Sequence, residues 1–419
     1  MNDRDLIGEI AGRIPGRPDP RLRAVWIVLF VLGVAAFVYL LATEPLRAWG
    51  AYGANLVFFL GVSLGAGTLA AAIRLSNGRW AASVVRIAES LTAYLPYGLA
   101  LLVVMLAIGI WRYLPWTHGL QQPRQAPFLN VPFLYMRTLA GFGLLWWLVH
   151  DMVRASLRRD LHLLRDRVSP ELRTEYDRLA GNWTTDAEER RRERDRLAQR
   201  SAQVCVVFAI VFTVFAWDFI MALTPTWVSP LFGWWVFMGA FLNGIAMTGL
   251  LATRLRARRR LEEWVTPDHF QDVGRLLFAF SIFWVYLFWS QYLVIWYGNI
   301  PEETWWVFLR FEDPWRRLAF SVFGLVFLIP FVFVMNAATK RSPFWLALFS
   351  LVVLVGMWLE RHLLIMPSLH PERVWLGLPE IGVGLGFLGI FGFAVQRFLA
   401  RYPAVKLTQL LEAREARAH

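Results

Sequence analysis

Long apolar segments recur along the whole chain, and they restrict its fold more than any other feature. Hydrophobic residues make up 57% of the sequence, with 32 Phe and 22 Trp, which is more apolar surface than one soluble core needs. A helix spans a bilayer with about 20 apolar residues. We therefore predict an all-α polytopic membrane protein. Its ten expected transmembrane helices lie near 24–42, 52–73, 81–110, 130–155, 202–223, 231–253, 270–297, 314–338, 343–365 and 378–400.

Several of these helices are expected to begin at a cap residue followed by proline, a pair that suits the first helical turn. The pairs are Ser229-Pro230, Asp313-Pro314 and Ser342-Pro343. The segment 81–110 is longer than a span requires, so we expect its helix to tilt or to project from the bilayer.

The arginines predict how the chain is oriented, because cytoplasmic loops are enriched in Arg and Lys. They cluster in the N-terminal tail, in the link 154–200, after the sixth expected helix and in the C-terminal tail. These segments fall on one side of the membrane, so both termini are expected in the cytoplasm. Arg316 and Arg317 are exceptions, because they follow Asp313 on the expected periplasmic side.

The same pattern divides the chain into five segments. They are a cytoplasmic tail (1–23), a first membrane half of four helices (24–156), a charged cytoplasmic helical link (157–200), a second membrane half of six helices (201–400) and a C-terminal tail (401–419). In the link, Ser169-Pro170 is expected to start one helix, and Thr185 with Glu188 forms a capping box for a second. The link is either a solvated helical hairpin or a docking surface for a cytoplasmic partner.

Charge and cysteine content exclude several classes of protein. A formal net charge of +12 would suit nucleic-acid binding, but the arginines follow the positive-inside pattern, so no nucleic-acid partner is expected. The chain has one cysteine, Cys205, and therefore no disulfide, no haem-attachment motif and no four-cysteine iron–sulfur site. No metal site is predicted. Any redox centre must diffuse in or lie on a partner.

The segment Ser281–Thr304, SIFWVYLFWSQYLVIWYGNIPEET, combines an apolar run with polar groups at helical spacing. Two faces follow from a period of 3.6 residues: one carries Tyr286, Ser290 and Tyr297, and the other carries Trp284, Phe288 and Gln291. The aromatic run ends in Gly298-Asn299 and then in acidic residues, as expected where a helix leaves the bilayer.

Charged groups inside the bilayer cost about 2.5–3.5 kcal/mol each, so the few present need partners, water or a task. Glu89 lies three residues after Arg86, which suits either a local ion pair or a proton-carrying group. His150 and Asp151 end the fourth expected helix, as an interfacial pair or as a point of proton uptake, since His titrates near neutral pH.

Two further sites carry similar alternatives. Asp218 either bonds the backbone near Thr224-Pro225, or it accepts a proton from a bound quinol or passes a proton outward. Glu360 and His362 form an interfacial ion cluster with Arg361, or else a proton exit.

The polar groups of the seventh helix also allow two interpretations. Tyr286, Ser290, Gln291 and Tyr292 make interhelical hydrogen bonds, or hold a water chain or a quinone head. Asn299, Glu302 and Glu303 cap helices and favour the helix dipole, or dock a periplasmic partner.

Two pairs of glycines at four-residue spacing predict close helix contacts. They are Gly61 with Gly65 and Gly382 with Gly386. Tight packing within the chain is favoured over a dimer interface.

Two stretches carry a resemblance to a known family. SQYLVIWYGNIPEET resembles the signature of the second of the two NrfD-like (polysulfide reductase type) membrane subunits of bacterial alternative complex III. AWDFIMALTPTWVSPLFGWW around Asp218 also resembles the NrfD-like subunits. The resemblance extends from about Ala202 to the C-terminal LARYP and is strongest over Asp272–Thr304. Glu360-Arg361 departs from it, because this pair is more similar to the first, or sister, NrfD-like subunit.

The resemblance implies two four-helix bundles within a ten-helix subunit that binds no metal or haem. It implies membership of a quinol:cytochrome c oxidoreductase in the bacterial inner membrane, with quinone, such as menaquinone, as a substrate. The implied partners are the sister NrfD-like subunit, a periplasmic iron–sulfur subunit, c-type haem subunits and membrane lipid. Iron–sulfur clusters and haem c would lie on those partners.

Together these observations predict a proton path and, in second place, a quinone site. The expected proton path comprises Glu89, His150, Asp151, Asp218, Tyr286, Ser290, Gln291, Glu360 and His362. The expected quinone contacts are Asp218, Trp289, Tyr292 and Trp296. The alternatives are a purely structural scaffold or a secondary transporter. A transporter is expected to have broken helices in corresponding positions of its two halves. Pro96 and Pro330 interrupt two helices, but they do not form a convincing repeat.

Overall fold

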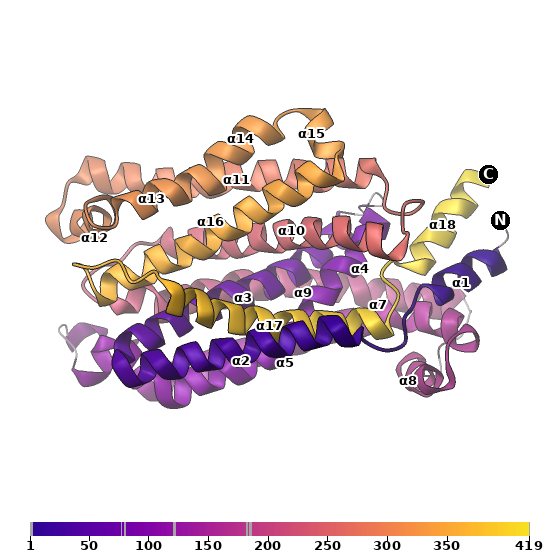
Figure 1. Cartoon of the computed structure of the whole chain (residues 1–419), viewed down its shortest axis with the longest axis horizontal. Coiled ribbons are helices and arrows are strands. Elements are labelled where there is room, and N and C mark those ends of the chain that lie inside the picture. The colour runs from indigo at the N-terminus through magenta and orange to yellow at the C-terminus, as the bar shows by residue number, and fades with distance from the viewer. Residues whose placement is uncertain are drawn as a thin grey trace.

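The computed structural model describes residues 3–76, 78, 81–119, 123–181, 183 and 187–418. Within this part of the chain every regular element is a helix, and ten spans are long and apolar enough to cross a membrane. The prediction of an all-α polytopic membrane protein is therefore confirmed. The long helices run side by side along the longest axis of the molecule (Figure 1).

The spans lie where the ten segments were predicted, and most have longer ends, whereas the eighth is shorter than its predicted range 314–338 and α9 ends four residues before the predicted 223. They are α2 (Pro20–Thr43), α3 (Pro45–Leu75), the series α4 (Ala82–Leu91), α5 (Leu95–Val104) and α6 (Ile110–Tyr113), α7 (Val131–Leu164), α9 (Ala187–Phe219), α10 (Phe232–Arg259), α11 (Pro267–Gly298), the pair α13 (Arg316–Phe323) and α14 (Ile329–Val334), α16 (Pro343–Leu369) and α17 (Leu378–Arg401).

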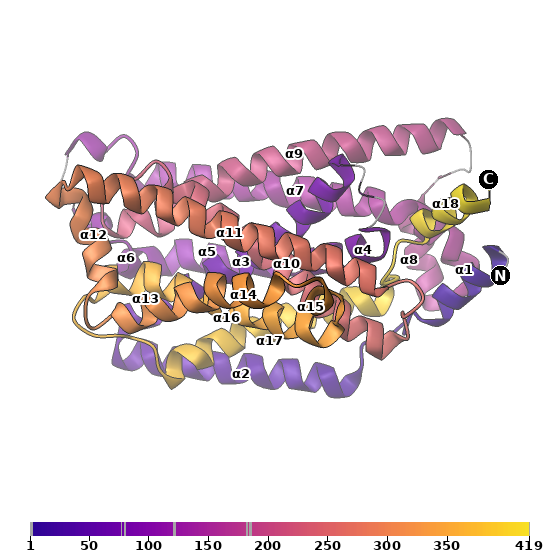
Figure 2. The same cartoon turned by 90° about the horizontal axis from the view of Figure 1, so that it is seen from above.

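Five shorter helices lie at the two ends of the bundle. They are α1 (Asp3–Gly12), α8 (Pro170–Ala180), α12 (Pro301–Phe311), α15 (Ala337–Arg341) and α18 (Leu407–Ala418). Both chain termini lie at the same end, together with α1, α8 and α18, whereas α12 lies at the other (Figures 1 and 2). We call these the terminal end and the α12 end. Both termini share one side of the bundle, as the arginine pattern predicts, and the assignment of that side to the cytoplasm stays a prediction.

The expected proline starts are partly confirmed. Pro343 follows the cap residue Ser342 in the first turn of α16, and Pro170 follows Ser169 in α8. Pro230 and Pro314, in contrast, lie in turns, and α10 and α13 begin two residues after them. Proline suits a tight turn as well as a first helical turn, so these two starts were predicted slightly too early.

The link between the halves is built largely from the membrane helices themselves. α7 continues to Leu164 and α9 begins at Ala187, so both helices project beyond the bilayer, with α8 between them. Glu188 lies in the first turn of α9, whereas its expected capping partner Thr185 lies outside the described residues. The five-segment division of the chain stays a prediction.

The third span is broken rather than simply long. A 3₁₀ turn over Thr92–Tyr94 separates α4 from α5, and a π-helical segment over Met105–Gly109 separates α5 from α6. Pro96 contributes to the break because it has no N–H to donate. A second π segment, Gly324–Leu328, precedes Pro330 between α13 and α14. The two breaks occur in opposite order along the chain, so they do not form a repeat.

α3 is the central helix of the molecule, and 94% of the residues in its most apolar stretch are buried. It packs against α4, α9, α10 and α16, and so joins one bundle (α3, α4–α6, α7, α9) to a second (α10, α11, α13–α14, α16). A Cβ added at Gly65 would lie 2.0 Å from the carbonyl oxygen of Ala240 in α10. Gly386 of α17 touches Gly33 of α2 in the same way. The predicted packing within the chain is confirmed for both glycine pairs.

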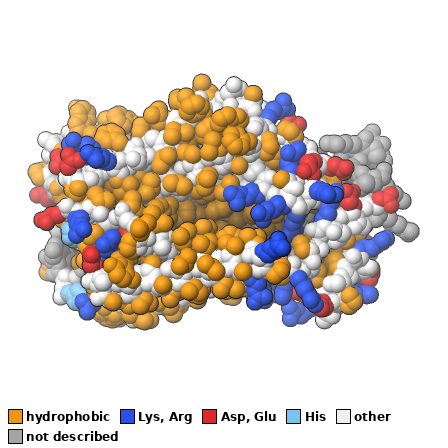
Figure 3. Space-filling model, in the orientation of Figure 1, with side chains coloured by type: hydrophobic (Ala, Val, Ile, Leu, Met, Phe, Trp, Pro, Cys, Tyr) orange, Lys and Arg blue, Asp and Glu red, His pale blue; other side chains and the backbone are white. Residues whose placement is uncertain are grey.

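α2 lies at one edge of the molecule, opposite α9 (Figure 2). It packs along α17, and only 11% of the residues in its most apolar stretch are buried. The rest of its surface is apolar, in keeping with a lipid-facing helix. Hydrophobic side chains cover the middle of the visible face, while charged side chains gather toward its two ends (Figure 3).

Candidate functional site: buried polar groups in the membrane bundle

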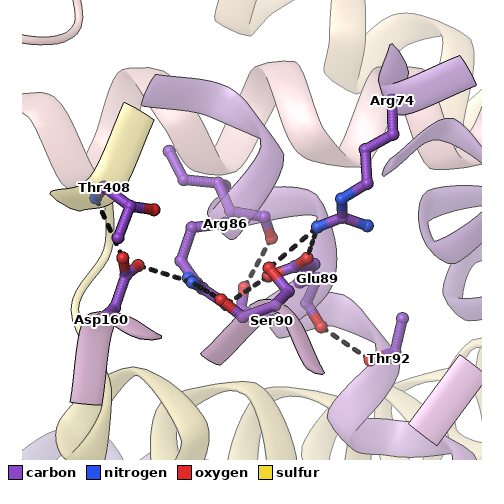
Figure 4. Close-up of polar contacts among 9 residues, drawn as sticks. Arg74, Arg86, Glu89, Ser90, Thr92, Asp160 and Thr408 are labelled. Atoms are coloured by element: carbon purple, nitrogen blue, oxygen red, sulfur yellow. Dashed lines mark hydrogen bonds and ion pairs between the residues drawn. The ribbon is translucent and has the colours of Figure 1, made fainter. Parts of the chain in front are cut away.

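A buried ion cluster ties the terminal end together (Figure 4). Arg86 of α4 binds Glu89 on the same helix and Asp160 of α7, with 2.7 Å between Nη2 and Oδ2. Arg74 of α3 also binds Glu89 and donates to Ser156 Oγ at 2.9 Å. The backbone N–H of Thr408 donates to Asp160 Oδ1 at 2.9 Å, so the cluster extends to the C-terminal segment.

In this cluster two guanidinium groups face two carboxylates. Glu89 forms the predicted local ion pair with Arg86, and its second partner, Arg74, was not predicted. Each carboxylate oxygen of Glu89 is held by a different guanidinium, Oε1 by Arg74 and Oε2 by Arg86. The geometry therefore describes a clamp that joins α3, α4, α7 and the C-terminal segment.

Lys406 lies beside this clamp and outside the membrane-spanning helices. Burial, together with the nearby charge of Arg74, lowers the pKa of its ammonium group to about 7, against the opposing effect of Asp160. The charge of this side chain therefore changes near neutral pH, unlike that of an ordinary lysine.

A second ion pair lies toward the α12 end. Arg137 of α7 reaches both carboxylate oxygens of Asp218 on α9, with Nε–Oδ2 at 2.8 Å and Nη2–Oδ1 at 2.5 Å. Asp218 is buried, and the guanidinium also stacks on the rings of Phe128 and Phe133. The side chain of Asp218 is thus occupied by an arginine, and not by the backbone near Thr224.

A third group of polar side chains lies between α10, α11 and α16, and its members belong to neither ion cluster. All its members are buried, and each has polar atoms without a hydrogen-bond partner within the described part of the chain. We call it the polar seam: Asn243, Ser281, Trp284, Ser350, Glu360 and Arg361. Buried polar atoms in native proteins are nearly always paired, by protein or by ordered water. The atoms of the seam therefore need more hydrogen-bond partners than the described residues supply.

Glu360 and Arg361 are the charged members of the seam. Arg361 Nη1 lies 2.9 Å from Glu360 Oε2, and its Nη2 donates to the carbonyl oxygen of Val236 at 3.2 Å. Trp284 approaches the carboxylate of Glu360 as a donor, but neither carboxyl oxygen has a hydrogen bond of ordinary geometry from the described residues. Gly239 makes room for the guanidinium, because a Cβ there would lie 2.8 Å from Arg361 Nη2. The charges are paired, but the hydrogen bonding is incomplete.

The seam extends along the bundle. Gly239 lies level with Arg361 and Trp284, whereas Gly249 lies level with Ser350, since a Cβ at Gly249 would be 3.0 Å from Ser350 Oγ. These glycines are ten residues apart on α10, which corresponds to about 15 Å of helix. Asn243 lies between them, and both its amide atoms are unpaired within the described chain. The seam thus covers about half of the membrane thickness.

The predicted residues of α11 divide between its two faces, as the sequence pattern indicated. Gln291 points inward, and its Oε1 has no partner among the described residues. Tyr286, Trp289 and Trp296 point outward and are 58%, 55% and 60% exposed. Ser290 and Tyr292 are half-buried. Of the expected proton-path residues on this helix, Gln291 is the one inside the bundle.

The other predicted groups lie apart from the seam. His150 is exposed and stacks on Trp146, while Asp151 binds Arg196 and Arg200 of α9. His362 is buried on another face of α16: its Nδ1 contacts the carbonyl oxygen of Trp358 at 3.0 Å.

At the α12 end, Asn299 is the left-handed C-cap of α11, as the capping interpretation predicted. Glu302 is exposed, and Glu303 is half-buried in the first turn of α12.

The structure adds residues that the sequence reasoning missed. Arg137 and Asp160 complete ion pairs whose other halves were identified, and Asn243 and Ser350 were overlooked in apolar runs. An isolated charge within an expected span, such as Arg137, was a usable signal, because it needs a partner. Asn243 and Ser350 gave a weaker signal in the sequence, since a single amide or hydroxyl is common in membrane helices.

The fold and the interior define a multi-pass membrane protein with buried polar groups and, among the described residues, no cluster of His, Cys, Asp or Glu that could hold a metal ion. The sequence matches the family described as "Polysulphide reductase, NrfD" over residues 41–370. The chain therefore belongs to the NrfD family, whose members are membrane subunits of quinone-related redox complexes. No curated protein matches the sequence.

Proposed function

We propose that this chain is a membrane subunit of a quinol:cytochrome c oxidoreductase of the alternative complex III type, and that it conducts protons across the inner membrane. Membership of the NrfD family and the stretch SQYLVIWYGNIPEET, which resembles the second NrfD-like component of that complex, support the first part. The polar seam supports the second part, and it is the observation that carries the proposal.

The physical argument rests on the unpaired atoms of the seam. A buried donor or acceptor without a partner costs about 1–3 kcal/mol, so a seam of such atoms strongly favours ordered water between the helices. Water held by Asn243, Ser350 and Glu360 forms a hydrogen-bonded chain along which protons move. Glu360 is the titratable carboxyl of this chain, and Arg361 stabilises it after proton release.

Polar groups continue from the seam toward the α12 end. Gln291 points inward on α11, about two helical turns beyond Trp284, and the buried Arg310 of α12 lies near the same end. Arg310 Nη2 donates to Ser368 Oγ at 2.8 Å, and Ser368 Oγ is 3.1 Å from Thr224 Oγ1. These groups provide an outlet for protons from Glu360.

The chemistry of quinol oxidation explains why protons and electrons would be handled by different subunits. Oxidation of a quinol releases two protons and two electrons. This chain offers titratable and hydrated groups for the protons, and the electrons would pass to iron–sulfur and c-type haem subunits beside the sister NrfD-like subunit. Trp289 and Trp296 expose their rings on α11, where a quinone diffusing in the bilayer would meet them. Asp218 is buried and bound to Arg137, so a quinone contact by Asp218 requires that this ion pair open.

Gentle purification of the tagged protein from its native membranes tests membership of the complex. We expect a c-type haem spectrum, iron–sulfur protein and a second NrfD-like subunit in the purified fraction. A colourless protein that purifies alone in several mild detergents would contradict the proposal and would favour a transporter.

A further inference from the structure

A pocket at the terminal end lies outside the polar seam and is independent of proton conduction. It encloses about 420 Å³ between the N-terminal segment, the start of α2, α8 and the end of α17. Four arginines line it, namely Arg17, Arg23, Arg397 and Arg401, against two carboxylates, Glu171 and Glu175. The pocket therefore carries an excess of positive charge.

The walls of this pocket are fixed by hydrogen bonds to α17. The N–H of Gly16 donates to the carbonyl oxygen of Ala400 at 2.9 Å, and Gln396 Nε2 donates to the carbonyl oxygen of Asp19 at 2.9 Å. On the opposite wall, Tyr176 of α8 donates to the carbonyl oxygen of Arg401 at 2.5 Å. The arginines are thus presented by a preformed frame, which lowers the entropy cost of binding.

The four arginines are not equivalent. Arg17 pairs with Glu171 at 2.6 Å, and Arg401 pairs with Glu175 at 3.2 Å. The side chains of Arg23 and Arg397 make no hydrogen bond or ion pair within the described chain. Two uncompensated guanidinium groups therefore face the pocket, and guanidinium groups bind phosphate well.

The position of these two groups relates the pocket to the membrane. Arg23 lies in the first turn of α2 and Arg397 in the last turns of α17, so both lie where the spans leave the bilayer. An exposed apolar stripe at three- and four-residue spacing continues from Arg23 along α2: Ile27, Phe30, Val34 and Val38. Phe30, Val34 and Val38 form part of a shallow, open apolar surface on this helix. The charge and the stripe together match a phosphate with acyl chains attached.

We propose that this pocket binds the phosphate headgroup of an anionic phospholipid, with an acyl chain along the apolar stripe of α2. Basic pockets at the cytoplasmic ends of membrane helices favour such headgroups by electrostatic attraction. The lipid would join α2, α8 and α17, and so would fix the peripheral helix pair to the terminal end.

Native mass spectrometry of the full-length protein tests this proposal. The protein is titrated with phosphatidylglycerol and, separately, with phosphatidylcholine of the same acyl chains. We expect a clear preference for phosphatidylglycerol, which the double variant Arg23→Gln/Arg397→Gln reduces by about tenfold to thirtyfold. The matched control is Arg254→Gln/Arg258→Gln, which removes two exposed arginines near the C-terminal end of α10 and should keep the preference.

Three results would overturn the proposal. The first is equal binding of the two lipids by the unsubstituted protein, a comparison that needs no variant. The second is displacement of phosphatidylglycerol by an excess of inorganic phosphate, which would identify a site for free phosphate instead of a lipid. The third is retention of phosphatidylglycerol by the double variant at the level of the control.

Discussion

Arg137 of α7 and Asp218 of α9 form a two-pronged ion pair inside the first bundle, with both carboxylate oxygens bound to one guanidinium. Removing one partner leaves the other charge buried and unpaired, which costs about 3–5 kcal/mol. We therefore expect Asp218→Asn to lower the unfolding temperature in detergent strongly. The double variant Arg137→Met/Asp218→Leu should recover most of the loss, because no charge remains. If Asp218→Asn is as stable as the unsubstituted protein, this pair does not hold α7 to α9.

Close contact between α3 and α10 leads to a second prediction. A Cβ at Gly65 would lie 2.0 Å from the backbone oxygen of Ala240, which cannot move independently of its helix. Gly65→Ala should therefore separate the two helices and reduce the yield of monodisperse protein. Gly143→Ala in α7 is the matched control, because no atom lies within 4 Å of its added Cβ. Equal behaviour of the two variants in size-exclusion chromatography would contradict close packing of α3 on α10.

The pKa of Lys406, lowered to about 7, predicts how stability depends on pH. Between this value and the unfolded pKa of 10.5, the unfolded chain binds more protons, so the free energy of unfolding rises with pH. Below pH 7 the charged ammonium is held at a cost in the folded protein. Lys406→Met should therefore be more stable than the unsubstituted protein at pH 6, by about 1–2 kcal/mol after allowance for solvent screening, and the difference should shrink by pH 9.

Thermal unfolding at the two pH values measures this difference. Arg190→Met, on the exposed start of α9, is the control for loss of a surface charge. If the stability advantage of Lys406→Met over the unsubstituted protein grows with pH, the predicted direction of the pH dependence is wrong.

The two faces of α11 provide a prediction about function. Gln291 points into the bundle with an unpaired Oε1 among the described residues, whereas Tyr286 points outward and is 58% exposed. Gln291→Leu should therefore lower proton release per electron in reconstituted vesicles, and Tyr286→Phe should leave it unchanged. The reverse order would place the path on the outer face of α11.

The sequence predicted the helices well because each span needs a long apolar run, and runs of this kind are visible without a structure. It also predicted the close glycine contacts and the cap at Asn299. The break in the third span was less visible, since Pro96 marks a distortion without indicating the π segment that follows.

The sequence could not predict which residues on different helices pair with each other. Glu89, Asp218 and Glu360 were all recognised as unusual, but their partners depend on which helices are neighbours. Asp218 has a guanidinium from a helix about 80 residues earlier, while Glu360 has an adjacent arginine and incomplete hydrogen bonding. Amphipathic periodicity shows which face a residue occupies, but not what lies opposite.

Proton release per electron in the Glu360→Gln variant tests conduction through the polar seam most directly. The complex is reconstituted into vesicles, supplied with quinol and cytochrome c, and compared with Glu302→Gln, which neutralises an exposed carboxylate at the α12 end. We predict a lower ratio of protons to electrons for Glu360→Gln, with electron transfer retained, and no change for Glu302→Gln. An unchanged ratio in a fully assembled Glu360→Gln complex would contradict proton conduction through the seam.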